Sequence, residues 1–277
     1  METSRLRSLL DRLHKGTGTI AVLTGAGISA ESGIPTFRGP EGYWTVGSTE
    51  YRPEQMATHF MFRQDPWEVW SWYLYRRAVC LRAEPNVGHK SIVTMESTLA
   101  DRMRLITQNV DGLHLRTGNT QERTFQIHGN LHFMRCAHSC STEIFPIPPS
   151  VGLKKRNESV TDEEKSLLVC PRCGSLARPH VLWFDETYNE QHFRADSSLR
   201  WAHQADLLLV VGTSGATNLP MQMGEIFSRR PEAIFLDVNP HPNPFREMAE
   251  AHPNGLALKG TACEILPVIA ELLVTRP

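Results

Sequence analysis

Short apolar segments recur along the chain of 277 residues, and each one ends in polar or glycine-rich residues. Segments of this length that are bounded by turn-forming residues are typical of buried β-strands. The predicted strands are 19–23, 103–106, 207–211, 233–238 and 256–258, and helices are predicted at 87–99 and 261–273. This alternation favours a parallel sheet wound with helices, in which ligands bind beyond the carboxyl ends of the strands.

Two stretches interrupt the alternation. Residues 40–84 are rich in Trp, Tyr and Arg and are predicted to be helical, whereas 131–178 contain four cysteines and several prolines. We interpret both as insertions that form a smaller domain. The predicted fold class is α/β, a Rossmann-like doubly wound parallel sheet with a smaller inserted zinc-binding and helical domain. The large domain is assigned to 1–39, 86–130 and 179–277, and the small domain to 40–85 and 131–178.

Composition and charge narrow the classes of function. Hydrophobic residues make up 40% of the chain and the net charge is -1, so no strong field favours nucleic acid or an anionic membrane. The apolar runs are too short to cross a bilayer. Residues 1–15 are typical of an amphipathic helix and lack the apolar stretch of a signal peptide. We therefore expect a cytoplasmic monomer with no nucleic-acid or membrane partner.

Four of the cysteines form two close pairs, Cys136 with Cys140 and Cys170 with Cys173. Two such pairs in one segment suit a tetrahedral structural zinc site with thiolate ligands. The alternatives are unpaired buried cysteines and disulfides, and disulfides are disfavoured in a chain that shows no secretion signal. His138 lies inside the first pair and is a competing candidate ligand. The spacing predicts one zinc ion.

A glycine turn, Gly25-Ala26-Gly27, follows the first predicted strand and opens a predicted helix. Glycines at such a turn let the backbone approach a ligand, and the helix N-terminus offers N–H groups to a pyrophosphate. A tight turn without a ligand explains the same residues. The carboxylate that an ordinary dinucleotide-binding turn places about 20 residues further on is missing, which argues against an NAD dehydrogenase.

Polar residues also follow the second predicted strand. Gln108, Asn109 and Asp111 carry amide and carboxylate groups that suit a sugar or a carboxamide. A capped loop that enters a helix explains Asn109 or Asp111 alone, but explains less well this density of polar groups. His128 stands beside Gly129 just before the cysteines, where it is a candidate general base near neutral pH.

Small or polar residues end two further strands. Gly212 and Thr213 permit close approach of a nucleotide, and Ser214 either contacts it or caps the next helix. Asn239 follows 233–238 and is the candidate partner of an adenosine ribose.

Taken together, these motifs resemble those of the sirtuin family, the NAD-dependent protein-lysine deacylases. The resemblance covers the chain from about residue 12 to 272. It rests on motifs that occur in the family's order: Gly25 to Gly33, Ile34-Pro-Thr-Phe-Arg38, Gln108-Asn-Val-Asp111, His128-Gly129, the four cysteines, Arg178-Pro-His-Val-Leu-Trp-Phe184, Gly212-Thr-Ser214 and Val238-Asn239.

The resemblance implies that NAD, as co-substrate, and an acyl-lysine meet in a cleft between the two domains, with one zinc ion in a structural role. The implied NAD-binding residues are Gly25, Ala26 and Gly27 at the phosphates; Phe37 and Arg38 on a loop that closes over NAD, with Tyr43 and Trp44; Gln108, Asn109 and Asp111 at the nicotinamide and its ribose; and Gly212, Thr213, Ser214, Asn239 and Ala262 at the adenosine half. The implied zinc ligands are Cys136, Cys140, Cys170 and Cys173.

The implied chemistry consumes NAD. The acyl oxygen attacks C1′ of the nicotinamide ribose and nicotinamide leaves, with Asn109 and Asp111 as catalytic residues in a dry polar pocket that suits a cationic transition state. His128 then acts as base on the ribose hydroxyls, so that the 2′-oxygen attacks the acyl carbon. The products are free lysine, nicotinamide and O-acyl-ADP-ribose, and the partners are acylated lysine side chains of proteins.

A second resemblance concerns the acyl group. Tyr73 and Arg76 are similar to the Tyr-x-x-Arg signature of the sirtuins that remove succinyl, malonyl and glutaryl groups. They lie one helical turn apart and share a face, so that Arg76 can form a charge-assisted bond to an acyl carboxylate. Ala57 matches the position where that class leaves room for a larger acyl group. A solvated basic face made of Arg76 and Arg77 is the alternative interpretation.

The substrate peptide is expected to add as a strand beside the segment Val181-Leu182-Trp183-Phe184. Asp185 stands where the family usually has glycine, and its acidic side chain is expected to alter how the peptide or the acyl-lysine enters. Residues 215–220 also depart from the family's usual apolar version. Two alternatives stay open: a deacetylase or mono-ADP-ribosyltransferase on the same scaffold, and a non-catalytic module that senses NAD.

Overall fold

The computed structural model describes residues 2–13, 18–35, 44–46 and 49–274. Of the residues expected to bind NAD, Phe37, Arg38 and Tyr43 lie outside the described residues. The backbone of Trp44 is described as part of a strand, but its side chain is not.

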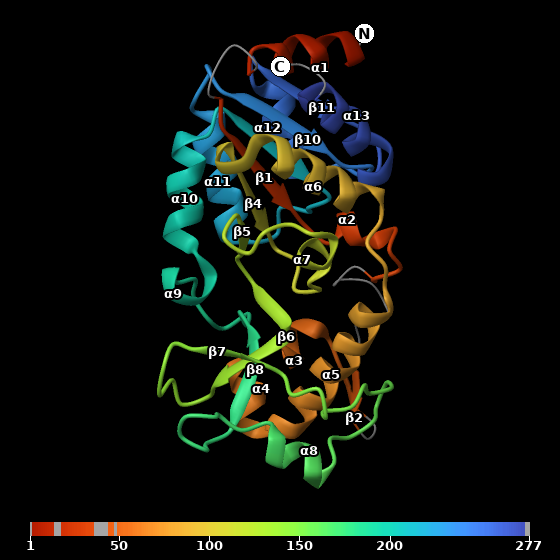
Figure 1. Ribbon diagram of the computed structural model, residues 1–277, viewed down its shortest axis with the longest axis vertical. Helices are drawn as coiled ribbons and strands as arrows, with labels where there is room; N and C mark the ends of the chain where they lie inside the picture. The colour runs from red at the N-terminus through yellow and green to blue at the C-terminus, as the bar shows by residue number, and fades with distance from the viewer. Residues whose placement is uncertain (1, 14–17, 36–43, 47–48, 275–277) are drawn as a thin grey trace.

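A six-stranded parallel sheet forms the larger part of the molecule (Figure 1), and it confirms the predicted α/β fold. All five predicted strands are present within one or two residues of their expected bounds. A further short strand, β5, was not predicted. In spatial order the strands are β11 (Gly255–Leu258), β10 (Ile234–Val238), β9 (Leu207–Val211), β1 (Ile20–Thr24), β4 (Met103–Thr107) and β5 (Thr124–Gln126).

Helices cover both faces of this sheet, which is why its strands are almost continuously apolar. Ile20 and Val22 of β1 point to one face, where they pack in a core with α1 (Glu2–Asp11), α6 (Val87–Leu99) and α13 (Ala262–Val274). Ala21 and Leu23 point to the other face and pack with α10 (Ala195–Gln204), α11 (Asn218–Ser228) and α12 (Pro244–Ala251). The pattern is a doubly wound sheet.

The smaller part lies at the lower end of the molecule in Figure 1. Its antiparallel sheet has the order β7 (Ile144–Pro146), β6 (Gly129–Cys136) and β8 (Ala177–Val181). Helices α3 (Pro53–Met56), α4 (His59–Gln64), α5 (Pro66–Arg82) and α8 (Asp162–Leu167) pack around it. The segment predicted to be helical also contains a hairpin, β2 (Trp44–Val46) and β3 (Thr49–Tyr51). The predicted domain limits at 130 and 179 fall inside β6 and β8.

Buried tryptophans fix the helices of the smaller part to its sheet. Trp70 and Trp72 of α5 are almost fully buried, and Trp70 donates its indole N–H to the carbonyl of Ala177 in β8 at 3.0 Å. Asp65 caps the N-terminus of α5 by accepting from the amides of Trp67 and Glu68. A capped helix with a buried aromatic face holds its side chains in fixed positions.

The remaining helical elements are short. They are α2 (Gly27–Ala30), the 3₁₀ turn at Ala100–Arg102, α7 (Leu113–Thr117) and α9 (Glu190–Phe193). Across the described ranges, every helix is too short or too polar to cross a membrane.

Gly129, at the start of β6, provides a test of the close packing between β6 and β8. Its φ is +86°, and a Cβ there would lie 2.1 Å from the carbonyl oxygen of His180. We expect Gly129→Ala to lower the free energy of unfolding by roughly 2–5 kcal/mol, from left-handed strain together with overpacking. The matched control is Gly33→Ala, because Gly33 has a φ of +81° with nothing within 4 Å of the added Cβ. Denaturant titration measures both, and equal losses would contradict the role of the close contact.

Candidate active site

Two glycine turns cross at the carboxyl edge of the sheet. The amide of Gly25 donates to the Val211 carbonyl at 3.0 Å, and the amide of Gly27 donates to the Gly212 carbonyl at 2.8 Å. A Cβ on Gly27 would lie 2.7 Å from the Cα of Gly212. The expected pyrophosphate turn therefore uses two of its amides inside the protein. Its glycines are required by this backbone crossing as well as by any ligand.

The polar residues after β4 converge on one hydroxyl that sequence reasoning did not single out. Ser29 of α2 donates to a carboxylate oxygen of Asp111 at 2.8 Å, and Asn109 donates its amide to the Ser29 oxygen at 3.1 Å. All three are buried. Burial raises the pKa of Asp111, although the hydrogen bonds from Leu113 and Ser29 oppose that rise. The only signal for Ser29 in the sequence is its place just behind the glycine turn.

Gln108 links the ends of the central strands. Its side-chain amide donates to the Thr213 hydroxyl at 2.9 Å and to the Thr24 carbonyl at 3.3 Å. Its side-chain oxygen accepts from the Thr217 hydroxyl at 3.0 Å. Gln108 is thus hydrogen-bonded to residues on the side of the expected site where the adenosine half of NAD would lie.

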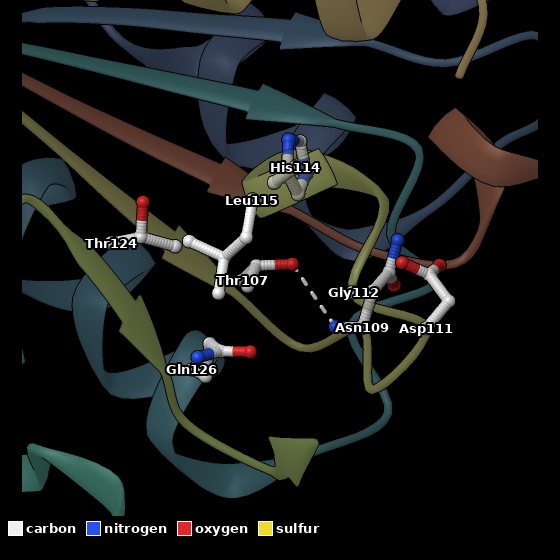
Figure 2. Close-up of a pocket in the computed structure, with 8 residues that line it drawn as sticks. All are labelled: Thr107, Asn109, Asp111, Gly112, His114, Leu115, Thr124 and Gln126. Atoms are coloured by element: carbon white, nitrogen blue, oxygen red, sulfur yellow. Dashed lines mark hydrogen bonds between the residues drawn. The ribbon is translucent and has the colours of Figure 1, made fainter. Parts of the chain in front are cut away.

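A small recess lies behind Asn109 and Asp111 (Figure 2). It is lined by the ends of β4 and β5 and by α7. Thr107, Thr124 and Gln126 line one side of it, and Asn109 and Asp111 lie together on another. The two candidate catalytic side chains therefore share one environment.

His128 has both ring nitrogens hydrogen-bonded. Nδ1 lies 2.9 Å from the carbonyl oxygen of Gln108, and Nε2 lies 2.7 Å from the hydroxyl of Tyr188. Burial lowers the pKa of His128 to about 4, against the opposing effect of the Gln108 hydrogen bond. The imidazole is neutral at pH 7, which is the state that a general base requires. Tyr188 was not predicted, because no motif connects it with His128.

The residues expected at the adenosine half lie on neighbouring elements. Thr213 is buried after β9, and Asn239 after β10 donates to the Thr213 carbonyl at 2.9 Å. Ala262 is the first residue of α13 and is also buried. Ser214 is exposed and does not cap the next helix, since the N-cap of α11 is Thr217.

Two of the three residues of the predicted acyl pocket, Tyr73 and Ala57, come together around Trp183. The Trp183 indole donates to the Tyr73 hydroxyl at 3.0 Å, and the next residue, Phe184, donates its amide to the Ala57 carbonyl at 2.9 Å. Tyr73, Ala57 and Trp183 are all buried. Burial lowers the pKa of Arg76, which lies half-buried one turn along α5 from Tyr73. The half-buried position of Arg76 argues against a fully solvated basic face.

The segment 181–184, beside which the substrate peptide is expected to add, is not a regular strand along its length. β8 ends at Val181, and the chain then turns. The amide of Leu182 donates to the His128 carbonyl at 3.0 Å, and that of Phe184 donates to Ala57. These amides are used inside the protein, so a strand pairing of the peptide along the whole segment is not supported.

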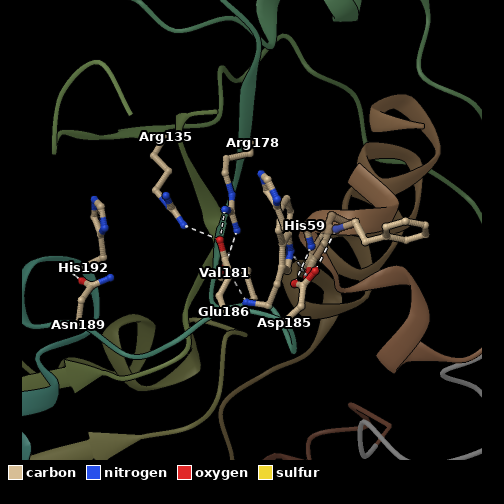
Figure 3. Close-up of polar contacts among 11 residues, drawn as sticks. His59, Arg135, Arg178, Val181, Asp185, Glu186, Asn189 and His192 are labelled. Atoms are coloured by element: carbon tan, nitrogen blue, oxygen red, sulfur yellow. Dashed lines mark hydrogen bonds and ion pairs between the residues drawn. The ribbon is translucent and has the colours of Figure 1, made fainter. Parts of the chain in front are cut away.

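Asp185 caps a helix. Its carboxylate accepts from the amides of His59 at 2.7 Å and Phe60 at 3.0 Å, at the N-terminus of α4 (Figure 3). An anion is favoured there by the helix dipole and the unpaired amides. We expected this charge to act on the entering substrate. The structure gives Asp185 another role, because its carboxylate joins the turn at 181–186 to α4.

The four paired cysteines form one compact cluster. Their Sγ atoms all lie within 4.8 Å of one another, with 3.7 Å between Cys136 and Cys173 and 3.6 Å between Cys140 and Cys170. Four thiolates at about 2.3 Å from a zinc ion would lie about 3.8 Å apart in a tetrahedron. The cysteines are therefore positioned to bind one zinc ion, and His138 is not part of the cluster.

Comparisons with known proteins agree with this arrangement. The model of the Sir2 family matches residues 25–218. A Leptospira interrogans protein named NAD-dependent protein deacylase is 37% identical over 259 residues, which are 93% of this chain and 94% of that protein. A Pyrobaculum aerophilum protein named NAD-dependent protein deacylase 2 is 38% identical over 92% of this chain and 91% of its own length. The solved structure of a Sir2 homolog–NAD complex has a TM-score of 0.77 at 31% identity, covering 100% of this chain and 96% of that one.

Zinc content tests the cysteine cluster. We expect one zinc per chain after purification under reducing conditions, measured by elemental mass spectrometry. Cys173→Ser removes one thiolate and should lower both the zinc content and the unfolding temperature, because metal binding contributes to folding of its module. Cys263→Ser is the matched control, since Cys263 is outside the cluster. A wild-type chain without stoichiometric zinc, or an unchanged zinc content in Cys173→Ser, would contradict the assignment.

Proposed function

The chain belongs to the Sir2 family, and we propose that it is an NAD-dependent protein-lysine deacylase that prefers acyl groups ending in a carboxylate. The observation that supports this most is the convergence of Asn109, Asp111 and His128 at one edge of the sheet. A neutral base and a buried polar pocket are brought together there.

NAD would extend along the carboxyl ends of the central strands. The glycine crossing of residues 25–27 and 212 lies where β1 and β9 are neighbours, which is where the strand order reverses. Ligands of doubly wound sheets bind at such a point. In the proposed pose the phosphates lie at this crossing. The nicotinamide ribose lies toward Asn109 and His128, and the adenosine lies toward Asn239 and Ala262.

The chain supplies the groups for each step of the deacylation. The buried Asn109–Ser29–Asp111 cluster offers fixed dipoles to the cationic ribosyl group as nicotinamide leaves. These side chains are already held in place by one another, so little reorganisation is needed. His128 then removes a proton from a ribose hydroxyl, and the oxygen attacks the acyl carbon.

The proposed acyl preference rests on the surroundings of Tyr73 and Arg76. The Tyr73 hydroxyl accepts from Trp183, so its own O–H can donate to an acyl group. Arg76 lies on the same face of α5 in a half-buried position, where it could form a charge-assisted bond to an acyl carboxylate. The amide of Leu182, the residue before Trp183, donates to the His128 carbonyl, which supports a pocket close to the base.

A panel of matched acetyl-, malonyl- and succinyl-lysine peptides tests this function, with NAD-dependent nicotinamide release as the readout. We expect succinyl- and malonyl-lysine to be the better substrates. Arg76→Met should lower kcat/KM for succinyl-lysine about 10- to 100-fold, because a hydrogen bond to a charged group contributes about 1.5–3 kcal/mol. The same change should alter acetyl-lysine turnover far less.

Arg82→Met is the matched control for this panel, since Arg82 is an exposed arginine at the end of the same helix. It should leave both activities unchanged. Equal rates on acetyl- and succinyl-lysine, with Arg76→Met harmless, would refute the acyl preference and leave a deacetylase. NAD binding without nicotinamide release would indicate a non-catalytic module.

A further inference from the structure

Tyr188 ends a chain of hydrogen bonds that runs through the candidate base. The Tyr188 hydroxyl contacts Nε2 of His128, and Nδ1 of His128 contacts the backbone of Gln108. The Gln108 side chain accepts from the hydroxyl of Thr217, which lies beside Tyr188. The four residues come from four separate loops at the edge of the sheet.

The direction of each hydrogen bond at His128 follows from the groups that make it. A carbonyl oxygen only accepts, so Nδ1 of His128 carries the proton and donates to Gln108. Nε2 of the neutral ring is then an acceptor, and the Tyr188 hydroxyl donates to it. Burial raises the pKa of Tyr188 to about 12, so the hydroxyl retains its proton at neutral pH. The base is therefore held in the tautomer that it needs.

The loop that carries Tyr188 is fixed on both sides (Figure 3). Two residues before it, the Glu186 carboxylate is bound by Arg178, lies 3.7 Å from Arg135, and accepts from the Trp183 amide at 3.0 Å. One residue after it, Asn189 caps α9 by accepting from the His192 amide at 2.8 Å. The backbone of Tyr188 therefore has little freedom to withdraw from His128.

Given the proposed function, on which this step rests, we propose that Tyr188 is a further catalytic residue that carries the proton of the ribose hydroxyl to His128. Neutral Nε2 has one lone pair, and Tyr188 already uses it. The phenol oxygen keeps a lone pair that can accept from the ribose hydroxyl. As that O–H bond breaks, its proton moves to the Tyr188 oxygen, and the Tyr188 proton moves to Nε2. The ribose oxygen keeps its electron pair and attacks the acyl carbon.

Two readouts on the purified enzyme separate this role from a structural one. Exchange of labelled nicotinamide into NAD reports cleavage of the nicotinamide bond, which requires no proton removal. Release of unmodified lysine requires it. We expect Tyr188→Phe to lower lysine release about 100-fold or more with nicotinamide exchange within threefold of wild type, as loss of general acid–base help predicts. Phenylalanine keeps the ring, whose centroid lies 5.8 Å from that of His128.

Thr187→Val is the matched control, because it removes a hydroxyl from the adjacent exposed position of the same loop. It should leave both readouts unchanged. Lysine release near the wild-type rate in Tyr188→Phe, with a lower KM for NAD, would overturn the proposal. It would show that the ribose hydroxyl displaces Tyr188 from Nε2 of His128 and bonds to the imidazole directly. A parallel loss of both readouts would overturn it as well, in favour of a structural role.

The same experiment separates this inference from the proposed function. Full lysine release by His128→Ala would refute the base assignment and, with it, the relay. A wild-type enzyme that releases no lysine with NAD would refute the proposed function and this step together. An active wild type, an inactive His128→Ala and a fully active Tyr188→Phe would refute the relay alone.

Discussion

The contact between two glycine turns is the constraint on which the site depends. The amide of Gly27 bonds to the carbonyl of Gly212, and a side chain at either glycine would meet backbone atoms within 2.7–2.8 Å. This contact fixes the end of β1 against the end of β9, where the strand order reverses. The pairing of Thr24 with Thr107 then sets the place of β4. The polar residues that follow each strand reach the same edge because the strands are held in this register.

The second feature of the site is that its polar groups satisfy one another inside a desolvated pocket. Asn109 and Asp111 share the Ser29 hydroxyl, and both nitrogens of His128 are hydrogen-bonded. Burial keeps this histidine neutral. Charge that develops during a reaction would be stabilised by fixed dipoles and not by water. Such electrostatic stabilisation is strongest in a site that excludes water. Such a pocket suits a reaction that breaks the bond to nicotinamide and consumes NAD.

Local patterns allowed much of the fold to be predicted, but not the contacts between distant loops. The strand at 207–211 was predicted residue for residue, because burial on both faces makes it continuously apolar. β5 has only three residues and no such pattern. The roles of Tyr188 and Asp185 depend on partners 60 and 126 residues away, and a sequence alone does not place those partners. The cysteine cluster was predictable because its spacing encodes its geometry.

Product analysis tests most directly whether this site uses NAD as a reagent. The wild-type enzyme is incubated with NAD and a succinyl-lysine peptide, and every product is quantified by mass spectrometry. We expect nicotinamide, unmodified peptide and succinyl-ADP-ribose in equal amounts, because the acyl group passes to the ribose oxygen. Free succinate released without consumption of NAD would contradict this, since it would show that water, and not the ribose held at this edge of the sheet, takes the acyl group.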